Sequence, residues 1–196
     1  DGRRVQLLAN VGDPKGVAGA VEANAEGVGL FRTEFCFLGH TEAPNVDEQV
    51  AAYRAVLAAF PGKKVVVRTL DAGADKPLPF LNPAAEANPA LGVRGLRTSV
   101  RFPGVLDDQL AAIAQAAAAE QATVWVMAPM VATAHEAAEF VQRCAAAGLE
   151  TAGVMVEVPG AASSAAHLLE SARFASLGTN DLTQYTMGAA RLLGEL

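Results

Sequence analysis

Short apolar runs, several of them rich in valine, alternate with longer alanine-rich stretches along this chain. Runs such as Val-Val-Val at 65–67 and Val-Met-Val at 154–156 are apolar on both faces, which is typical of strands in a covered parallel sheet. The runs that predict strands are 5–10, 27–33, 65–70, 124–129, 153–158 and 174–178. The stretches that predict helices are 17–25, 47–60, 106–121, 135–147 and 161–171. This repeated strand-then-helix order predicts an α/β protein, either doubly wound or a barrel.

The number of predicted strands bears on the choice between these two folds. A complete (β/α)₈ barrel needs eight strands and typically about 250 residues. This chain has 196 residues, and only 181–196 follow the sixth predicted strand. No repeat or linker divides it, so we expect residues 1–196 to form one domain. That domain is either an open sheet or a barrel truncated to about six β/α units.

The charge and the cysteine content exclude several classes of function. The formal net charge is −6, whereas nucleic acids and anionic membranes select proteins with a basic surface. No apolar run approaches the ~18 residues of a membrane span, and the charged N-terminal segment leads into no signal-peptide core. The two cysteines cannot form a disulfide framework. The composition therefore predicts an acidic, cytoplasmic, globular protein without nucleic-acid binding or membrane insertion.

Charged and amide side chains follow the predicted strands at the point where each strand ends. Arg32 and Arg68 end the second and third strands, Glu157 ends the fifth, and Asn180 and Asp181 follow the sixth. In parallel α/β folds the carboxyl ends of the strands face the active site. We therefore expect these side chains to converge on one rim of the fold.

The residue types on this rim indicate a kind of chemistry. Glu157 and Asp181 follow neighbouring strands, which lie ~4.8 Å apart, so their carboxylates can share one cation. Mg²⁺ prefers one or two carboxylates together with water and substrate oxygens. Arginines bind phosphate and carboxylate groups in a bidentate manner. The rim therefore predicts a locally positive, Mg²⁺-assisted site for a small molecule that carries a phosphate and a carboxylate.

Five segments of the chain resemble the PEP-utilising enzymes, in the order in which that family has them. The most specific is Ser-Leu-Gly-Thr-Asn-Asp-Leu-Thr-Gln-Tyr-Thr at 176–186. The others are Gly-Val-Gly-Leu-Phe-Arg-Thr-Glu-Phe at 27–35, Val-Val-Arg-Thr-Leu-Asp-Ala-Gly-Ala-Asp-Lys at 66–76, Asn-Pro-Ala-Leu-Gly-Val-Arg-Gly-Leu-Arg at 88–97 and Val-Met-Val-Glu-Val-Pro at 154–159. Among these enzymes the chain looks most like the phosphoenolpyruvate (PEP)–protein phosphotransferases, or enzymes I. The resemblance implies a (β/α)₈ barrel of which about six units are present.

The resemblance also implies roles for individual residues. Glu157 and Asp181 match the Mg²⁺ ligands of the family. The residues that match the substrate-binding positions are Arg32, Arg68, Arg94, Asn180, Asp181 and Arg191. Lys76 lies in the long proline-rich connection 71–91, which we expect to face the substrate. Ala190 stands where the family usually has aspartate before the arginine, which leaves the orientation of Arg191 open.

The activity implied by the resemblance is phosphoryl transfer. PEP would give its phosphoryl group to a histidine on a separate N-terminal domain, which passes it to a phosphocarrier protein, and a cysteine would protonate the remaining enolate to give pyruvate. We expect the acceptor histidine, the acid cysteine and the phosphocarrier-binding domain to lie outside this chain. No catalytic residue is then expected within 1–196, and the isolated chain is expected to be inactive. The resemblance further implies a homodimer in the full-length protein.

Two alternatives remain open from the sequence. The same rim residues occur in pyruvate phosphate dikinase and PEP synthase, and a non-catalytic module that senses PEP or Mg²⁺ would also use them. Other chemistry-bearing residues have simpler interpretations. We expect His40 in a solvated loop, His135 early in its helix and His167 on a helix surface. We expect Cys144 and Trp125 to pack in the core. Cys36 follows the second strand near the rim, and an acid role for it is the less favoured interpretation.

Overall fold

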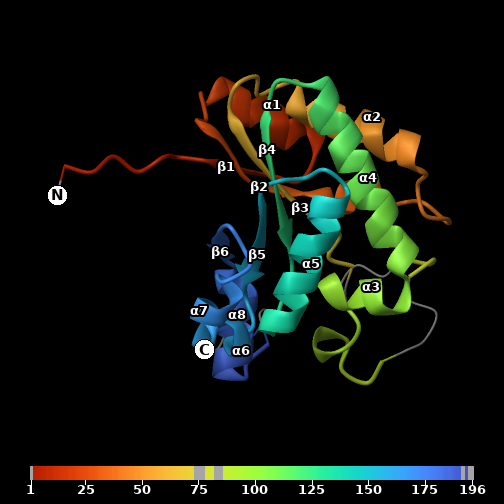
Figure 1. The fold of residues 1–196 in the computed structure, drawn as a ribbon, viewed down its shortest axis with the longest axis vertical. Helices are drawn as coiled ribbons and strands as arrows, with labels where there is room; N and C mark the ends of the chain where they lie inside the picture. Colours follow the sequence, from red (N-terminus) through yellow and green to blue (C-terminus); the bar gives the residue numbers. More distant parts are fainter. Residues whose placement is uncertain (1, 73–77, 82–85, 191–192, 194–196) are drawn as a thin grey trace.

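The computed structural model describes residues 2–72, 78–81, 86–190 and 193 of the chain. These residues form one six-stranded parallel sheet in which each strand pairs with the next one in sequence. The strands are β1 (Ala9–Val11), β2 (Gly27–Arg32), β3 (Lys64–Arg68), β4 (Thr123–Ala128), β5 (Ala152–Val156) and β6 (Ala175–Leu177). The sheet is curled, with the helices around it (Figure 1).

The helices follow the strands in the predicted alternation. The α-helices are α1 (Pro14–Glu22), α2 (Val46–Leu57), α3 (Thr98–Arg101), α4 (Pro103–Ala119), α5 (Ala134–Ala146), α6 (Pro159–Ser163), α7 (Ala165–Leu168) and α8 (Thr179–Met187). The short 3₁₀ helices are η1 (Thr33–Cys36), η2 (Pro89–Leu91) and η3 (Gly95–Arg97). Capping boxes define the starts of α2 and α5, where Asn45 pairs with Glu48 and Thr133 with Glu136.

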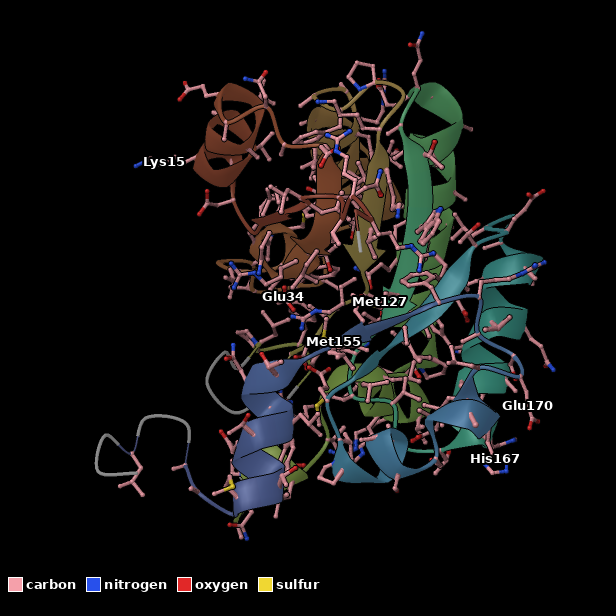
Figure 2. The ribbon with its side chains drawn as sticks, turned by 90° about the vertical axis from the view of Figure 1, so that its left-hand side faces the viewer. Lys15, Glu34, Met127, Met155, His167 and Glu170 are labelled. Carbon is pink, nitrogen blue, oxygen red and sulfur yellow. The ribbon has the colours of Figure 1, made fainter. Side chains whose placement is uncertain are left out.

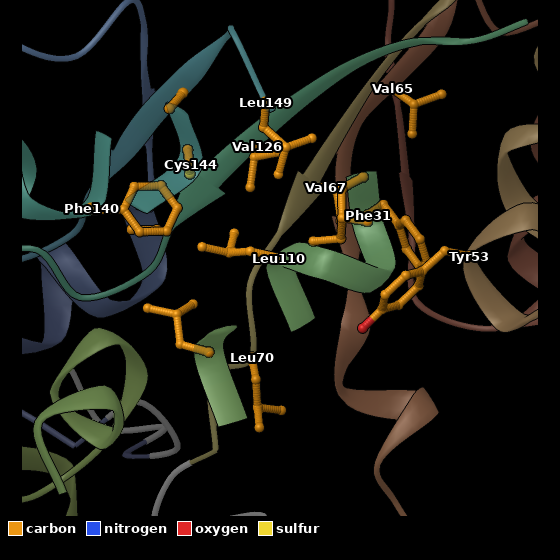
Figure 3. Packing of buried hydrophobic residues seen from close by; sticks show 14 of the residues in the cluster. Phe31, Tyr53, Val65, Val67, Leu70, Leu110, Val126, Phe140, Cys144 and Leu149 are labelled. Carbon is orange, nitrogen blue, oxygen red and sulfur yellow. The ribbon is translucent and has the colours of Figure 1, made fainter. Parts of the chain in front are cut away.

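The main hydrophobic core lies between one face of the sheet and the helices. Phe31, Val65 and Val67 from the strands pack with Tyr53 of α2 and Leu110 of α4 (Figure 3). The rings of Phe31 and Tyr53 meet edge to face with their centroids 6.1 Å apart. Residues of α1, α2, α4, α5 and α7 all belong to this one cluster, so these helices cover the same face of the sheet.

The opposite, concave face of the sheet carries a smaller apolar cluster. Val66, Met127 and Met155 are buried there, and Trp125 packs against Phe174 with ring centroids 4.9 Å apart. Because side chains alternate along a strand, Arg68 shares this face with Val66, and Glu157 shares it with Met155. The concave face therefore ends in charged residues at the carboxyl ends of β3 and β5.

The predicted fold class is confirmed, and the order of the strands decides between its two forms. A doubly wound sheet reverses its strand order at a switch point and has helices on both faces. Here the order is β1 to β6 without reversal and the helices of the main core cover one face. The described residues therefore form a half-barrel of the truncated (β/α)₈ type.

The structure departs from the sequence prediction most clearly in two predicted elements and in one helix that was not predicted. The predicted helix 161–171 is split into α6 and α7, because the hydroxyls of Ser163 and Ser164 both donate to the carbonyl of Gly160 and compete with the helical pattern. The predicted first strand starts at Ala9 instead of residue 5, since Val5 and Leu7 are about three-quarters exposed and gain nothing from strand pairing. Helix α8 was not predicted.

The other sequence interpretations concern isolated side chains. His40 and His167 are exposed, His135 is the second residue of α5, and Cys144 is buried in the main core, as predicted. Trp125 is only half-buried, and Nζ of Lys64 lies 4.2 Å from its ring centroid. Cys36 is buried, and burial raises the pKa of its thiol to about 12, which makes it a weaker acid than an ordinary thiol. In the part of the chain that the structure describes, no helix is both long and apolar enough to cross a membrane.

Candidate active site

Arg68 is the last residue of β3, and its guanidinium lies on the concave face. Nη2 donates to Oε1 of Glu34 at 2.5 Å, and Nη1 lies 3.7 Å from Oδ2 of Asp71. Nη1 also lies 3.7 Å from Sδ of Met155, so the guanidinium reaches from β3 to the neighbourhood of β5. Figure 2 labels Glu34 and Met155 near the middle of the molecule. Arg68 is therefore a buried cation held between two carboxylates.

Arg94 precedes η3 and extends the same network toward α8. Its Nη2 donates to Oδ2 of Asp71 at 2.9 Å, and its Nη1 to Oδ1 of Asp181 at 3.2 Å. The hydroxyl of Tyr185, one helical turn after Asp181, lies 3.3 Å from the same Nη1. Burial lowers the pKa of Arg94, but Asp71 and Asp181 raise it by more, so the net pKa lies above the usual value. Asp71 thus bridges the two arginines, and three segments that are distant in sequence meet here.

Glu157 follows β5 and is 1% exposed. One carboxylate oxygen, Oε1, accepts a hydrogen bond of 2.7 Å from the backbone N–H of Met130. Burial raises the pKa of Glu157 to about 7, with smaller contributions from the charges of Asp71 and Asp181. Gly178 packs directly against this carboxylate, because a Cβ added at position 178 would lie 2.6 Å from Oε2. The hydrogen bond from Met130 therefore fixes the orientation of the Glu157 carboxylate, and burial and the acidic neighbours raise its pKa.

Asn180 and Asp181, both predicted as rim residues, lie at the start of helix α8. Asp181 lies in its first turn and is 8% exposed. Its carboxylate pairs with Arg94. Asn180, its neighbour, is exposed. The structure therefore brings Asp181 into the charged network, whereas the side chain of Asn180 is open to solvent.

Arg32 stands apart from this network. It is paired in register with Arg68 across β2 and β3, but its side chain is exposed. Its guanidinium lies over Gly12, where an added Cβ would lie 2.7 Å from Nη2. It makes no ion pair with the residues that the structure describes. Arg191 and Lys76 lie outside the described residues.

The charge balance of the site differs from the sequence expectation. Arg68 and Arg94 are surrounded by Glu34, Asp71 and Asp181, so the positive charge expected from the arginines is neutralised by neighbouring carboxylates. Within the described part of the chain, two buried polar atoms remain without a hydrogen-bond partner, Nε of Arg68 and Oε2 of Glu34. Unsatisfied atoms of this kind are costly in a protein interior and are often explained by a ligand or ion.

The candidate metal ligands fit Mg²⁺ in their chemistry. Glu157 and Asp181 supply carboxylate oxygens, which Mg²⁺ prefers, and Mg²⁺ sites often contain only one or two protein carboxylates. Over 2–72, 78–81, 86–190 and 193, no cluster of three or more histidine, cysteine, aspartate or glutamate side chains is arranged to hold a metal. Water and substrate oxygens would have to complete the coordination.

Sequence reasoning missed Glu34, Asp71 and Tyr185 as members of the site. The signal for the two acids was present, because each follows a strand-end arginine by two or three residues, in Arg-Thr-Glu and Arg-Thr-Leu-Asp. Tyr185 could have been found only by recognising α8, since i and i+4 residues of a helix share one face.

Known proteins are similar to this chain over nearly its whole length. Residues 1–194 match the family described as PEP-utilising enzyme, PEP-binding domain. A protein of Streptomyces coelicolor named phosphoenolpyruvate-protein phosphotransferase is 57% identical over 196 residues, which cover 99% of this chain and 35% of that protein. A protein of the same name from Staphylococcus carnosus is 43% identical over 98% of this chain and 35% of its own length. A multiphosphoryl transfer protein of Rhodobacter capsulatus is 42% identical over 98% of this chain and 24% of its length.

The chain thus spans about a third or less of the length of these curated relatives. Both the family match and the similarity to the relatives extend over nearly the whole chain. The chain belongs to the PEP-utilising enzyme family and corresponds to its PEP-binding domain.

Proposed function

We propose that this chain forms the PEP site of a PEP–protein phosphotransferase. The enzyme would transfer the phosphoryl group of PEP to one of its own histidines and then to a phosphocarrier protein, releasing pyruvate. One observation carries the proposal. The chain is similar over nearly its whole length to proteins of that name, and its Arg68, Arg94 and Asp181 belong to one buried network of charges. Glu157 is buried as well, and the charge of Asp181 contributes to the raised pKa of its carboxyl group.

The arginines would bind the two anionic groups of PEP. Arg68 and Arg32 would hold the phosphate, and the unpartnered Nε of Arg68 supports this role because it is a buried donor available to a ligand. Arg94, Asn180, Asp181 and Arg191 would complete the pocket. An incoming anion would share or replace the contacts that Asp71 now makes with Arg68 and Arg94.

Glu157 and Asp181 would hold Mg²⁺. An ion held by these two carboxylates would supply positive charge beside the phosphoryl group. The hydrogen bond from Met130 fixes one oxygen of Glu157 and leaves the other for the ion. Gly178 leaves room beside that oxygen, because any larger residue would press against it.

The chemical step would depend on charge stabilisation. The bond between phosphorus and the enol oxygen of PEP breaks, and a bond from phosphorus to the histidine nitrogen forms. The arginines would spread the charge of a loose transition state over their guanidinium groups. The enolate then takes a proton at its methylene carbon to give pyruvate. Because the relatives are about three times as long as this chain, we assign the histidine and the proton donor to other parts of the enzyme.

The names of the relatives favour a phosphotransferase over the dikinase and the sensing-module alternatives. The phosphocarrier partner, the homodimer and the cytoplasmic location are part of the same proposal. The acidic composition and the reduced cysteines support an intracellular enzyme.

Calorimetric titration of PEP into the chain, with and without Mg²⁺, tests the proposal. We expect binding with Mg²⁺ that weakens at least about tenfold without the ion and in Glu157→Gln, because the substitution removes a charged ligand. The control Glu150→Gln changes an exposed carboxylate and should leave binding unchanged. Binding that is insensitive both to Mg²⁺ and to Glu157→Gln, or absent in the unaltered chain, would contradict the proposal.

A further inference from the structure

We propose that Gln109 is a positioning residue of the candidate active site. It lies on α4, on the helix side of the sheet, and fixes the backbone at the end of β3 that carries Arg68 and Asp71. Its effect on ligand affinity rests on the proposed function, whereas its effect on the position of Arg68 does not.

Gln109 is 1% exposed and uses all of its amide hydrogen-bonding groups within the protein. Its Oε1 accepts from the backbone N–H of Leu70 at 2.8 Å. Its Nε2 donates to Oγ1 of Thr33 at 3.1 Å and to the hydroxyl of Tyr53 at 3.0 Å. One side chain therefore ties the segments after β2 and β3 to the helices α2 and α4.

Thr33 connects Gln109 to the backbone of Arg68. Its Oγ1 donates to the backbone carbonyl of Arg68 at 2.9 Å. The polar cluster formed by Gln109 and Thr33 thus holds the backbone on both sides of Thr69, at the carbonyl of Arg68 and at the N–H of Leu70.

This anchoring occurs where the sheet stops supporting the chain. β3 ends at Arg68, and the next backbone bond to β4 runs from the N–H of Thr69 to the carbonyl of Met127 at 2.9 Å. Beyond it, Leu70 bonds to Gln109, and the N–H of Asp71 lies 3.3 Å from Glu34. After Thr69, side-chain hydrogen bonds therefore take the place of the backbone bonds between strands, and they hold the backbone from which Arg68 and Asp71 extend.

The choice of glutamine here needs a reason beyond packing. Gln109 sits in a helix face shared with Leu110 and Ile113, which are buried in the main core. A buried amide is favourable only when every polar atom is satisfied, and an apolar side chain would carry no such requirement. A fully satisfied polar group in this place specifies one geometry of the strand ends. A misplacement of about 1 Å can lower the rate of a catalysed reaction about a hundredfold.

Tyr53 provides a matched control, because it belongs to the same network on the side away from the site. Its hydroxyl donates to Oε1 of Gln49 at 2.9 Å, and Nε2 of Gln49 donates to the carbonyl of Pro44 at 3.0 Å. Tyr53→Phe removes both hydrogen bonds of this hydroxyl, the one it accepts from Gln109 and the one it donates to Gln49, but leaves the contacts of Gln109 with Leu70 and Thr33. If the network only stabilised the core, neither Tyr53→Phe nor Gln109→Met would change the environment of Arg68.

The experiment compares Gln109→Met, Tyr53→Phe, Thr33→Val and Thr33→Ser in the full chain. The first readout is the NMR signal of the Arg68 Nε–H group, which reports on the environment of the guanidinium without any ligand. The second is the dissociation constant for PEP in the presence of Mg²⁺. We expect Gln109→Met and Thr33→Val to shift or broaden the Arg68 signal and to weaken PEP binding about tenfold. Tyr53→Phe and Thr33→Ser should leave the Arg68 signal in place and should change the dissociation constant by no more than about twofold.

The outcomes separate this inference from the proposed function. An unchanged Arg68 signal in both Gln109→Met and Thr33→Val would overturn the positioning role, and so would an equal effect of Tyr53→Phe. If Gln109→Met does not fold, the pair Thr33→Val and Thr33→Ser decides, because these variants differ in whether the hydroxyl is kept. Failure of the unaltered chain to bind PEP would overturn the proposed function alone, since the Arg68 signal would still decide the role of Gln109.

Discussion

Replacing Glu34 by glutamine would remove the nearest counter-charge of Arg68 in a buried place. The two side chains are 7% and 10% exposed, and the atoms Oε1 and Nη2 lie 2.5 Å apart. Glutamine keeps the shape and one acceptor oxygen but not the charge. Arg68 would then depend on Asp71, whose Oδ2 is farther away at 3.7 Å.

The expected cost follows from this geometry. Removing one partner of a buried ion pair costs about 3–5 kcal/mol, because the remaining charge is left uncompensated. Asp71 compensates part of the charge, and the amide oxygen of glutamine can still accept a hydrogen bond. We therefore expect Glu34→Gln to lower the free energy of unfolding by about 2–3 kcal/mol, below the usual range.

Urea unfolding followed by the fluorescence of Trp125, the single tryptophan, measures this difference. The matched control is Glu120→Gln, which breaks the ion pair of Arg54 and Glu120, whose side chains are 51% and 17% exposed. Such exposed pairs are worth at most about 1 kcal/mol. If Glu34→Gln costs no more than Glu120→Gln, the account of Arg68 as a buried, carboxylate-held cation is wrong.

Two further predictions concern Glu157. Gly178→Ala should destabilise the protein by about 1–3 kcal/mol and weaken PEP binding, because the added Cβ would lie 2.6 Å from the Glu157 carboxylate. Urea unfolding measures the loss of stability, and calorimetry measures the loss of binding. The control is Gly104→Ala, where an added Cβ would meet no other atom within 4 Å. Because burial raises the pKa of Glu157 from 4.5 to about 7, the folded state holds this proton more tightly than the unfolded state. As the pH rises from about 4.5 to about 7, the free energy of unfolding of the metal-free wild type should therefore fall relative to that of Glu157→Gln, by about 3 kcal/mol in all. Urea unfolding at several pH values measures this, and parallel profiles for the two proteins would refute it.

The strand ends that carry the site could be predicted from the sequence because two local signals coincide there. Arg68 and Glu157 each follow a run of apolar residues, and the carboxyl ends of parallel strands meet at one edge. The alternation of strands and helices fixes this arrangement without knowledge of any side-chain contact. The elements built from short, polar segments were less accessible, and α8 is the example, since Gly-Thr-Asn-Asp has the composition of a loop.

The pairing within the site could not be predicted, because it depends on three-dimensional contacts. Nothing in the sequence indicates that Asp71 lies between Arg68 and Arg94, or that Asp181 faces Arg94. The neutralisation of Arg68 and Arg94 was missed for this reason, since the acids that pair with them come from other segments. The roles of Arg32, Asn180 and Arg191 stay predictions.

A crystal structure of the chain with PEP and Mn²⁺ in place of Mg²⁺ tests the central claim most directly, because Mn²⁺ can be located by its anomalous scattering. The account predicts one metal peak within coordination distance of both Glu157 and Asp181, with the phosphate of PEP in contact with Arg68. A metal bound away from Glu157, or PEP bound at another surface of the chain while Arg68 keeps its present partners, would contradict it.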